Sequence, residues 1–261
     1  MPEQHYLEVS GLSKLFGSGE HAVTALGNVS FSLAEGRFLS ILGPSGCGKS
    51  TLFNIIAGLM PPATGDVTLQ GESLLMKPGK TAYMLQKDLL LPWRTVADNI
   101  TLPQTLRGVR RKKALAAALP DARACGLESL IHRRPVALSG GQKQRAALVR
   151  SLQSGKPLML LDEPFGALDA ITRLHLHQLL TAICIQKKRT VLFVTHDVDE
   201  ALLLSDEVLV MGCHPGRIIG HYHLPQEKPR TMKTLALPRL MEVKAEIMAL
   251  LDQEVKQHGT K

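Results

Sequence analysis

Short runs of consecutive apolar residues recur along the chain between glycine-rich and polar segments. Such runs occupy residues 38–42, 158–161 and 190–194. The run 158–161, which is apolar throughout, is typical of a parallel strand that is buried on both faces. The segment 29–33 instead alternates apolar and polar side chains, as a strand with one covered face does. We therefore predict antiparallel strands within residues 6–42 and a buried parallel sheet farther along the chain.

Helical periodicity dominates the spaces between the later runs. The pattern predicts helices within 95–130 and at 141–153, 172–185 and 198–204, with short strands at 66–70 and 81–85. Strands that alternate with helices indicate an α/β fold with a parallel sheet. After Pro238 an apolar stripe recurs at helical spacing, formed by Leu240, Val243, Ile247, Leu251 and Val255. We expect this stripe to pack on its own domain, and the alternative is a regulatory or partner contact.

The loop after the first buried run matches the phosphate-binding pattern G-x-x-x-x-G-K-[ST] at every fixed position. It consists of Gly43, Pro44, Ser45, Gly46, Cys47, Gly48, Lys49, Ser50 and Thr51. Glycines let the backbone approach phosphates closely, and the amides that open the following helix form an anion site. Lys49 would place its charge between the β- and γ-phosphates, and Ser50 would offer its hydroxyl to Mg²⁺. The alternative is a glycine-rich turn without a ligand, and the complete pattern between a strand and a helix disfavours it.

Two carboxylates, Asp162 and Glu163, directly follow the apolar run 158–161. Ligands of open α/β sheets bind at the carboxyl ends of the strands, where these side chains are expected. Asp162 would then hold Mg²⁺ through its water shell, and Glu163 would polarise the water that attacks the γ-phosphate. The alternative is a pair of solvated turn carboxylates, which is disfavoured downstream of a P-loop and a buried strand.

Several further motifs, taken with the P-loop, resemble those of the ATPase subunits of ATP-binding cassette (ABC) transporters. Residues 138–145, Leu-Ser-Gly-Gly-Gln-Lys-Gln-Arg, resemble the family's signature sequence. By the same resemblance Gln86 belongs to the Q-loop, residues 167–169 form the D-loop, and His196 is the switch histidine. Phe16 takes the place of the aromatic residue that stacks on adenine, with a position in the core as the alternative.

The resemblance covers residues 6–222 and implies a RecA-like P-loop core with an antiparallel β-subdomain and an inserted helical subdomain. An ABC ATPase domain of this kind would span residues 5–235, with the helical subdomain at about 87–140. Residues 236–261 would form a C-terminal amphipathic helix and tail.

The resemblance also implies that the chain hydrolyses ATP with the help of Mg²⁺. The catalytic residues would be Glu163, His196 and Gln86, and the metal would be held by Ser50, Gln86 and, through water, Asp162. Besides the P-loop and Phe16, the residues that contact ATP would be Ser139, Gly140, Gly141, Gln142 and Asp169. In the family the signature sequence faces the nucleotide of a second copy, so that Ser139 and Gly141 would contact the γ-phosphate held by Lys49 of that copy. The implied ATP-bound state is therefore a homodimer.

The residues after Gln86 and three later segments resemble the importer branch for nitrate, taurine, aliphatic sulfonates and thiamine-pyrimidine precursors. These marks are the Leu-Leu-Pro-Trp run that ends at Trp93 and the segments 165–170, 195–202 and 211–218. Members of that branch dock on integral membrane permease subunits at the cytoplasmic face of the cell membrane and serve an extracytoplasmic solute-binding protein indirectly. Trp93 follows an apolar run in a predicted surface loop, so we expect it at the permease contact. Burial of Trp93 inside the helical subdomain is the alternative.

Composition limits the remaining alternatives. No apolar run reaches the length of about 18 residues that a membrane span needs, and residues 1–6 lack the features of a signal peptide. The cysteines lack metal-ligand spacing and are expected to be free thiols: Cys47, Cys125, Cys184 and Cys213. An ATPase of an exporter or lipoprotein-release system and a soluble ABC ATPase remain alternative functions. A single cassette without a heptad run disfavours the soluble class.

The net charge of +8 comes in part from the basic run 107–113. We interpret this run as a solvated helix start, with proximity to anionic lipid as the alternative. No nucleic-acid partner is expected, because the basic residues are not interleaved with aromatic ones. His221 and His223 have the spacing of metal ligands on a strand. No further ligand lies nearby in the sequence, so we expect no metal there.

Overall fold

Two β-sheets lie at the centre of the computed structural model, which describes residues 6–166, 168–225 and 228–258. The strands are β1 (Leu7–Phe16), β2 (Val23–Leu33), β3 (Phe38–Leu42), β4 (Thr64–Leu69), β5 (Glu72–Ser73), β6 (Ala82–Met84), β7 (Leu158–Asp162), β8 (Thr190–Val194), β9 (Glu207–Gly212) and β10 (Arg217–His223). The α-helices are α1 (Lys49–Ile56), α2 (Val96–Ile100), α3 (Leu102–Leu106), α4 (Arg111–Ala124), α5 (Gly140–Leu152), α6 (Ala170–Gln186), α7 (Val198–Leu204), α8 (Met232–Leu235) and α9 (Pro238–His258). Short 3₁₀ turns lie at Gly19–His21, Glu128–Leu130 and Pro135–Ala137.

The two sheets differ in how their strands pair. One has the antiparallel order β2-β1-β4-β5, and the other has the order β10-β9-β3-β8-β7-β6. In the second sheet β3 pairs in parallel with β8 and β9, and only β10 runs antiparallel to its neighbour. The prediction of antiparallel strands is confirmed for β1 and β2 but was wrong for Phe38–Leu42. Every residue of that strand is buried, as a strand in the middle of a covered parallel sheet requires.

A hydrophobic core fills the space between the two sheets. Helix α1 contributes Leu52, Phe53, Ile55 and Ile56 to it, and they meet side chains from β1, β3, β7 and β8. Burying one such side chain stabilises the fold by about 1.5–3 kcal/mol. This packing fixes the first turn of α1, where the P-loop ends.

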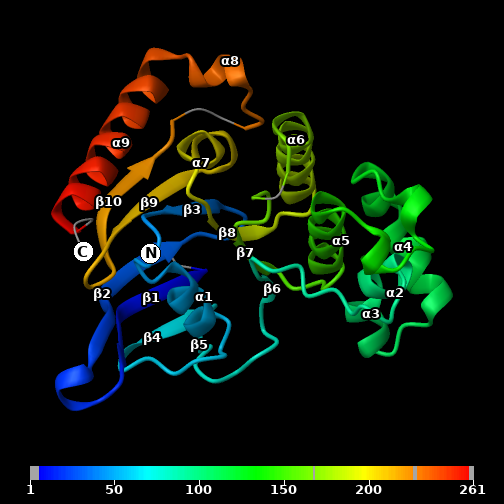
Figure 1. Ribbon diagram of the computed structural model, residues 1–261, viewed down its shortest axis with the longest axis horizontal. Coiled ribbons are helices and arrows are strands. Elements are labelled where there is room, and N and C mark those ends of the chain that lie inside the picture. Colours follow the sequence, from blue (N-terminus) through cyan, green and yellow to red (C-terminus); the bar gives the residue numbers. More distant parts are fainter. Residues whose placement is uncertain (1–5, 167, 226–227, 259–261) are drawn as a thin grey trace.

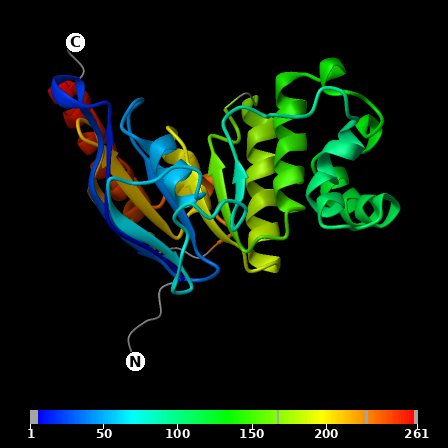
Figure 2. The same cartoon turned by 90° about the horizontal axis from the view of Figure 1, so that it is seen from below.

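Helices cover the other face of the six-stranded sheet. Helices α5 and α6 share a core with β7 and β8, while α7 and α9 pack on β3, β9 and β10. In Figures 1 and 2, α9 lies at one end of the molecule and helices α2 to α4 lie at the opposite end. The result is a layered α/β fold with a group of short helices beyond α5.

The predicted helical stretch 95–130 is divided into several pieces. Gly108 has a positive φ of 84° and lies between α3 and α4, while Pro120 is accommodated within α4. Part of the basic run 107–113 is used to hold these pieces together. The Arg107 guanidinium donates to the carbonyl of Ser154, and Arg111 forms an ion pair with Asp98 at 2.6 Å. Both arginines make these polar contacts while they stay exposed, as expected for a solvated run.

Helix α9 packs its apolar stripe against its own domain. Leu240, Val243 and Ile247 are buried beneath α7 and β9, whereas Val255 is exposed near the end of the helix. Among the described residues, no helix combines the length and the apolar character that crossing a bilayer requires.

Candidate active site

The P-loop bends sharply between β3 and α1. Gly46 and Gly48 adopt positive φ angles of 83° and 94°, which side chains rarely tolerate. A Cβ atom on Gly48 would lie 2.9 Å from the carbonyl oxygen of Ala25, so only glycine fits. The Lys49 ammonium lies inside the loop and donates to the carbonyl oxygens of Gly43 and Pro44, both at 2.7 Å. The chain therefore presents a concave loop with a buried positive charge, as a phosphate site requires.

The turn between β9 and β10 packs against the P-loop. Gly216 exchanges backbone hydrogen bonds with Ala25 and Gly27 of β2. A Cβ atom on Gly216 would lie only 2.2 Å from the carbonyl oxygen of Cys47. The Cys47 side chain itself is buried, and its sulfur lies 3.5 Å from the Lys49 ammonium. A segment distant in sequence thus helps to fix the shape of the phosphate loop.

Oxygen ligands suited to Mg²⁺ lie beside the P-loop. The Ser50 hydroxyl donates to the Asp162 carboxylate at 3.1 Å, which brings the start of α1 to the end of β7. Burial raises the pKa of Asp162, although the hydrogen bond from Ser50 acts in the opposite direction. A nearby cation would relieve the cost of this buried carboxylate. The hydroxyl, the carboxylate and the Gln86 carboxamide therefore form a donor set that fits Mg²⁺.

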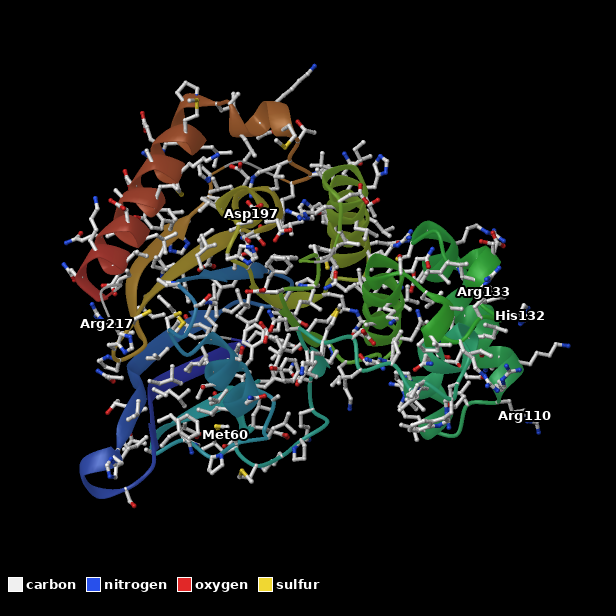
Figure 3. The ribbon with its side chains drawn as sticks, viewed as in Figure 1. Met60, Arg110, His132, Arg133, Asp197 and Arg217 are labelled. Carbon is white, nitrogen blue, oxygen red and sulfur yellow. The ribbon has the colours of Figure 1, made fainter. Side chains whose placement is uncertain are left out.

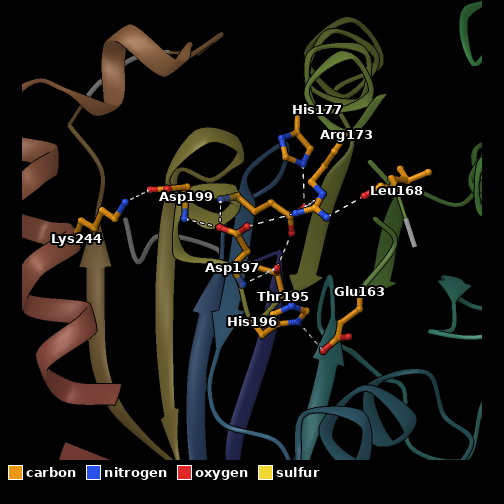
Figure 4. A network of polar contacts seen from close by, with 10 residues as sticks. Glu163, Leu168, Arg173, His177, Thr195, His196, Asp197, Asp199 and Lys244 are labelled. Carbon is orange, nitrogen blue, oxygen red and sulfur yellow. Dashed lines mark hydrogen bonds and ion pairs between the residues drawn. The ribbon is translucent and has the colours of Figure 1, made fainter. Parts of the chain in front are cut away.

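Glu163 lies where the ends of three neighbouring parallel strands meet. Its backbone has a positive φ of 46° and its amide donates to the Val194 carbonyl at the end of β8. The Gln86 amide, which follows β6, donates to one Glu163 carboxylate oxygen at 3.0 Å. The Nδ1 atom of His196 lies 3.4 Å from the other oxygen (Figure 4). The structure thus brings together all three residues predicted to be catalytic.

These groups surround one open pocket. Its lining residues are Ser45, Gly46, Gly48, Lys49, Ser50, Thr51, Gln86, Asp162 and Glu163. His196 and Glu163 also line a smaller adjoining pocket. The phosphate loop, the metal-type oxygen donors and Glu163 therefore share one cavity, which can hold a triphosphate and a water molecule near the same carboxylate.

The signature residues lie outside this pocket, at the start of α5. Ser139 caps the helix by accepting from the Gln142 amide, and the Gln142 side chain accepts from the Ser139 amide. Ser139 and Gly140 are exposed, and Gly141 and Gln142 are partly exposed. The motif therefore presents a helix N-terminus to solvent, away from the P-loop of its own chain.

Phe16 and Asp169 have more peripheral positions. The Phe16 ring is 41% exposed, so it is not a core residue, and the Lys14 ammonium lies 5.2 Å from its centre. Phe16 does not line the pocket around Lys49, and its stacking on adenine stays a prediction. Asp169 caps α6 by accepting from the Thr172 amide, and this bond lowers the pKa of its carboxyl. Ala167, the first residue of the predicted D-loop, lies outside the described residues.

The structure adds a polar network that the sequence motifs do not reveal. The buried Glu200 carboxylate accepts from the Thr195 hydroxyl at 2.5 Å and contacts the His177 ring at 3.1 Å (Figure 4). Arg173 of α6 bonds the Leu168 carbonyl at 3.0 Å and forms an ion pair with Asp197 at 3.5 Å. These contacts hold the His196 loop beside the D-loop. The signal in the sequence is the Asp197 cap with Glu200 three positions later, which resembles a capping box.

The expectation that His221 and His223 lack a further ligand was wrong. Glu207 of β9 lies beside both histidines of β10, because the antiparallel register pairs Glu207 with His223. Glu207 was not identified from the sequence, because it is distant in sequence from His221 and His223.

The cysteine expectation is confirmed, since Cys47, Cys125, Cys184 and Cys213 are all free. Each is buried, so the thiol in the P-loop is shielded from solvent.

Comparisons with known proteins agree with this geometry. The ABC transporter family matches residues 26–166. A taurine import ATP-binding protein from Rhizobium johnstonii is 40% identical over 88% of this chain and 89% of its own length. An aliphatic sulfonates import ATP-binding protein from Bacillus cereus is 39% identical over 87% of this chain and 90% of its own length. An uncharacterised ABC transporter ATP-binding protein from Methanocaldococcus jannaschii is 39% identical over 95% of this chain and 92% of its own length.

Solved structures share the fold as well. A dimeric ATP-binding cassette in a post-hydrolysis state, bound to ADP and phosphate, matches with a TM-score of 0.77 and 30% identity. The match covers 85% of this chain and 100% of that chain. The chain belongs to the ABC transporter family, as an ATP-binding cassette that hydrolyses ATP.

Proposed function

We propose that this chain powers a bacterial ABC importer for a small solute such as taurine, an aliphatic sulfonate or nitrate. The observation that carries the proposal is the similarity, over almost the full length of both chains, to taurine and aliphatic sulfonates import ATP-binding proteins. The solute itself would be bound by other subunits. Its class is proposed from these relatives, and the residues of the ATP site do not select it.

In this proposal the chain's own residues carry out hydrolysis. Glu163 accepts a proton from the attacking water, and the contacts from Gln86 and His196 orient its two carboxylate oxygens. Lys49 and the P-loop amides hold the phosphates, and Ser50 and Asp162 face the position of Mg²⁺. When bound, Mg²⁺ would neutralise charge on the β- and γ-phosphates.

We further propose that two copies close around ATP, so that the signature sequence of one faces the P-loop of the other. Two observations support this arrangement. The signature residues include the exposed N-terminus of α5, and they do not line the pocket of their own chain. The similar solved cassette is dimeric in a state bound to ADP and phosphate. In such a dimer, Ser139 and Gly141 of one copy supply hydrogen-bond donors to the γ-phosphate on the other.

The proposed permease contact lies on the loop between β6 and α2. Trp93 is 68% exposed, which contradicts its burial in the helical subdomain, and Leu85 and Leu89 are exposed in the same loop. Gln86, between these leucines, reaches the Glu163 carboxylate. Contact at this loop would therefore act on the residue that activates water. In this arrangement the chain is peripheral, at the cytoplasmic face of the membrane, and an extracytoplasmic binding protein acts through the permease.

We assign the proposed ATPase domain to residues 5–235, with the helical subdomain at about 87–140 and a tail at 236–261. Helices α2 to α4 lie together beyond α5, and α9 packs across α7, β9 and β10, which supports this division (Figure 1).

Transport in proteoliposomes tests the proposal. The chain is reconstituted with its cognate permease and binding protein, and uptake of labelled taurine, an alkyl sulfonate and nitrate is measured with internal ATP. We expect ATP-dependent uptake of one of these solutes, and its loss with Glu163→Gln. ATP-driven efflux, or hydrolysis without uptake of any of the three, would reject the importer assignment.

Trp93→Ala tests the docking loop. We expect hydrolysis by the isolated chain within about twofold of wild type, because an exposed surface substitution usually changes stability little. Co-purification with the permease and its stimulation of hydrolysis should fall, since exposed tryptophans are frequent binding hot spots. Val136→Ala, on another exposed apolar side chain, is the control. Normal assembly and stimulation of the Trp93 variant would show that the permease binds elsewhere.

A further inference from the structure

Two histidines and one glutamate converge on the last pair of strands in the six-stranded sheet. The Nε2 atom of His221 lies 2.8 Å from Oε2 of Glu207, and Nδ1 of His223 lies 3.7 Å from the same oxygen. One ligand atom from each residue lies within 4.8 Å of the others. The two imidazole rings are 4.6 Å apart between centroids. None of these residues takes part in the ATP site described above.

The strand register explains why these side chains share one face. Residues two apart on a strand point to the same side, which places His221 and His223 together on β10. Glu207 pairs directly with His223 across the antiparallel ladder, so its side chain lies on that same side. The Glu207 side chain is only 15% exposed, whereas those of His221 and His223 are 38% and 74% exposed. The group is therefore held by backbone pairing and is open to solvent.

We propose that Glu207, His221 and His223 form a binding site for a divalent transition-metal ion of the zinc type. Two imidazole nitrogens with one carboxylate oxygen are a frequent protein ligand set for zinc, with a further position left for water. Ligand atoms at about 2.1 Å from a tetrahedral zinc ion lie about 3.4 Å apart. The two distances from Glu207, 2.8 and 3.7 Å, bracket that value, and all three ligand atoms lie within 4.8 Å of one another.

The chemistry of the donors selects the class of metal. Mg²⁺ and Ca²⁺ prefer oxygen ligands, so the two imidazoles disfavour the ion that the ATP site would use. Imidazole suits zinc, copper and nickel, and copper is expected to compete most strongly. A hydrogen bond between His221 and Glu207 explains the position of those two side chains only. It does not explain why the His223 ring lies against the His221 ring.

The metal site is separate from the nucleotide pocket along the sheet. Glu207 pairs with Leu39 at the start of β3, and Val210 pairs with Leu42, after which the P-loop begins. At the rise of a β-strand, the pair of Glu207 and Leu39 lies about 10 Å along the sheet from the pair of Val210 and Leu42. A bound ion would tie the edge strand β10 to β9, and it would stabilise the folded chain through mass action.

Calorimetric titration with zinc chloride tests the site. The full chain is freed of metal with a chelator and studied without nucleotide or Mg²⁺. We expect one equivalent of zinc to bind to these residues and the thermal midpoint to rise with zinc. His221→Ala/His223→Ala should abolish this binding, and Glu207→Gln should weaken it by about 10–100-fold, at least as much as the loss of an outer-shell partner.

His132→Ala is the matched control, because His132 is exposed and lies at the opposite end of the molecule from Arg217 of β10 (Figure 3). Its zinc affinity should equal that of wild type. Circular dichroism and basal ATP hydrolysis verify that each variant is folded. The proposal is overturned if wild type binds no zinc, if the double variant binds as well as wild type, or if Glu207→Gln has unchanged affinity.

Discussion

The P-loop and the signature sequence are both predicted to contact the phosphates of ATP, yet the P-loop is built into the fold and the signature sequence is exposed. Lys49 and Asp162 are buried and have partners from their own chain. Ser139 and Gly140 are exposed, and the Ser139 hydroxyl accepts from the Gln142 amide of its own helix. The residues around the P-loop are thus assembled inside the fold, whereas the signature residues form an exposed surface. The contrast fits the proposal that the two motifs of one chain belong to two different nucleotide sites.

Glu163→Gln should have the largest effect, and it separates chemistry from assembly. The amide keeps the shape of the carboxylate but cannot accept the proton, and a general base typically contributes about 10²–10⁴-fold to the rate. We expect hydrolysis to fall by that factor, while ATP still binds and a dimer accumulates in size-exclusion chromatography with MgATP. Glu8→Gln, on an exposed position of β1, is the control. Normal hydrolysis would exclude Glu163 as the base, and a persistent monomer at high ATP would contradict the sandwich.

Lys49→Ala should weaken nucleotide binding on the P-loop side. Hydrogen bonds to charged groups contribute about 1.5–3 kcal/mol, which corresponds to roughly 10–150-fold in affinity. Calorimetry with MgATP measures the change, and Lys256→Ala on the exposed face of α9 serves as the control. Wild-type affinity in the Lys49 variant would mean that the loop amides alone hold the phosphates.

A mixed dimer tests the two halves directly. Ser139→Arg blocks the signature surface, and Lys49→Ala disables the P-loop. If the halves meet across the dimer, a heterodimer of the two variants has one intact site and one site with both lesions. We therefore expect about half of the wild-type nucleotide trapped per dimer, which counting of crosslinked nucleotide would measure.

The control for the mixed dimer is Ser139→Thr, which keeps the helix cap. Two equally damaged sites in the heterodimer would show that each signature acts on its own chain.

The smallest effects concern the stability of the free chain and distinguish Asp162 from Asp169. Burial raises the pKa of Asp162 in the folded chain, so the folded state holds this proton more tightly than the unfolded chain does. The stability of the fold therefore decreases as the pH rises from the unfolded pKa of Asp162 to its higher folded pKa. We expect Asp162→Asn to raise the thermal midpoint at pH 7 without nucleotide or Mg²⁺, and the gain to shrink in acid. Capping lowers the pKa of Asp169, so its contribution is present at neutral pH and is lost as the pH falls through the folded pKa.

Asp169→Ala should accordingly lower the midpoint at pH 7, with a difference that also shrinks in acid. Calorimetric scans between about pH 2 and pH 8, which include the range below the ordinary pKa of an aspartate, compare both variants with wild type. An Asp162 variant that is less stable than wild type at pH 7 would contradict the assignment of a costly buried charge.

Much of this arrangement could be predicted from local sequence. The strand at Thr190–Val194 and the helix at Val198–Leu204 have the predicted ends, because an apolar run and an Asp cap mark them. The P-loop could be predicted equally well, because its pattern is contiguous in the sequence. What local pattern could not provide was pairing between distant strands. The parallel partners of Phe38–Leu42 and the position of Glu207 beside His223 depend on register between segments far apart in sequence.

The exposure of Trp93 gives the chain a built-in optical reporter. It is the only tryptophan in the sequence, and 68% of its surface is open to solvent. The intrinsic indole fluorescence therefore arises from one point on the loop next to Gln86. Transfer of that ring from water to an apolar contact would shift its emission to shorter wavelength. A label-free spectrum can thus follow association at this loop in real time, separately from any signal at the phosphate site.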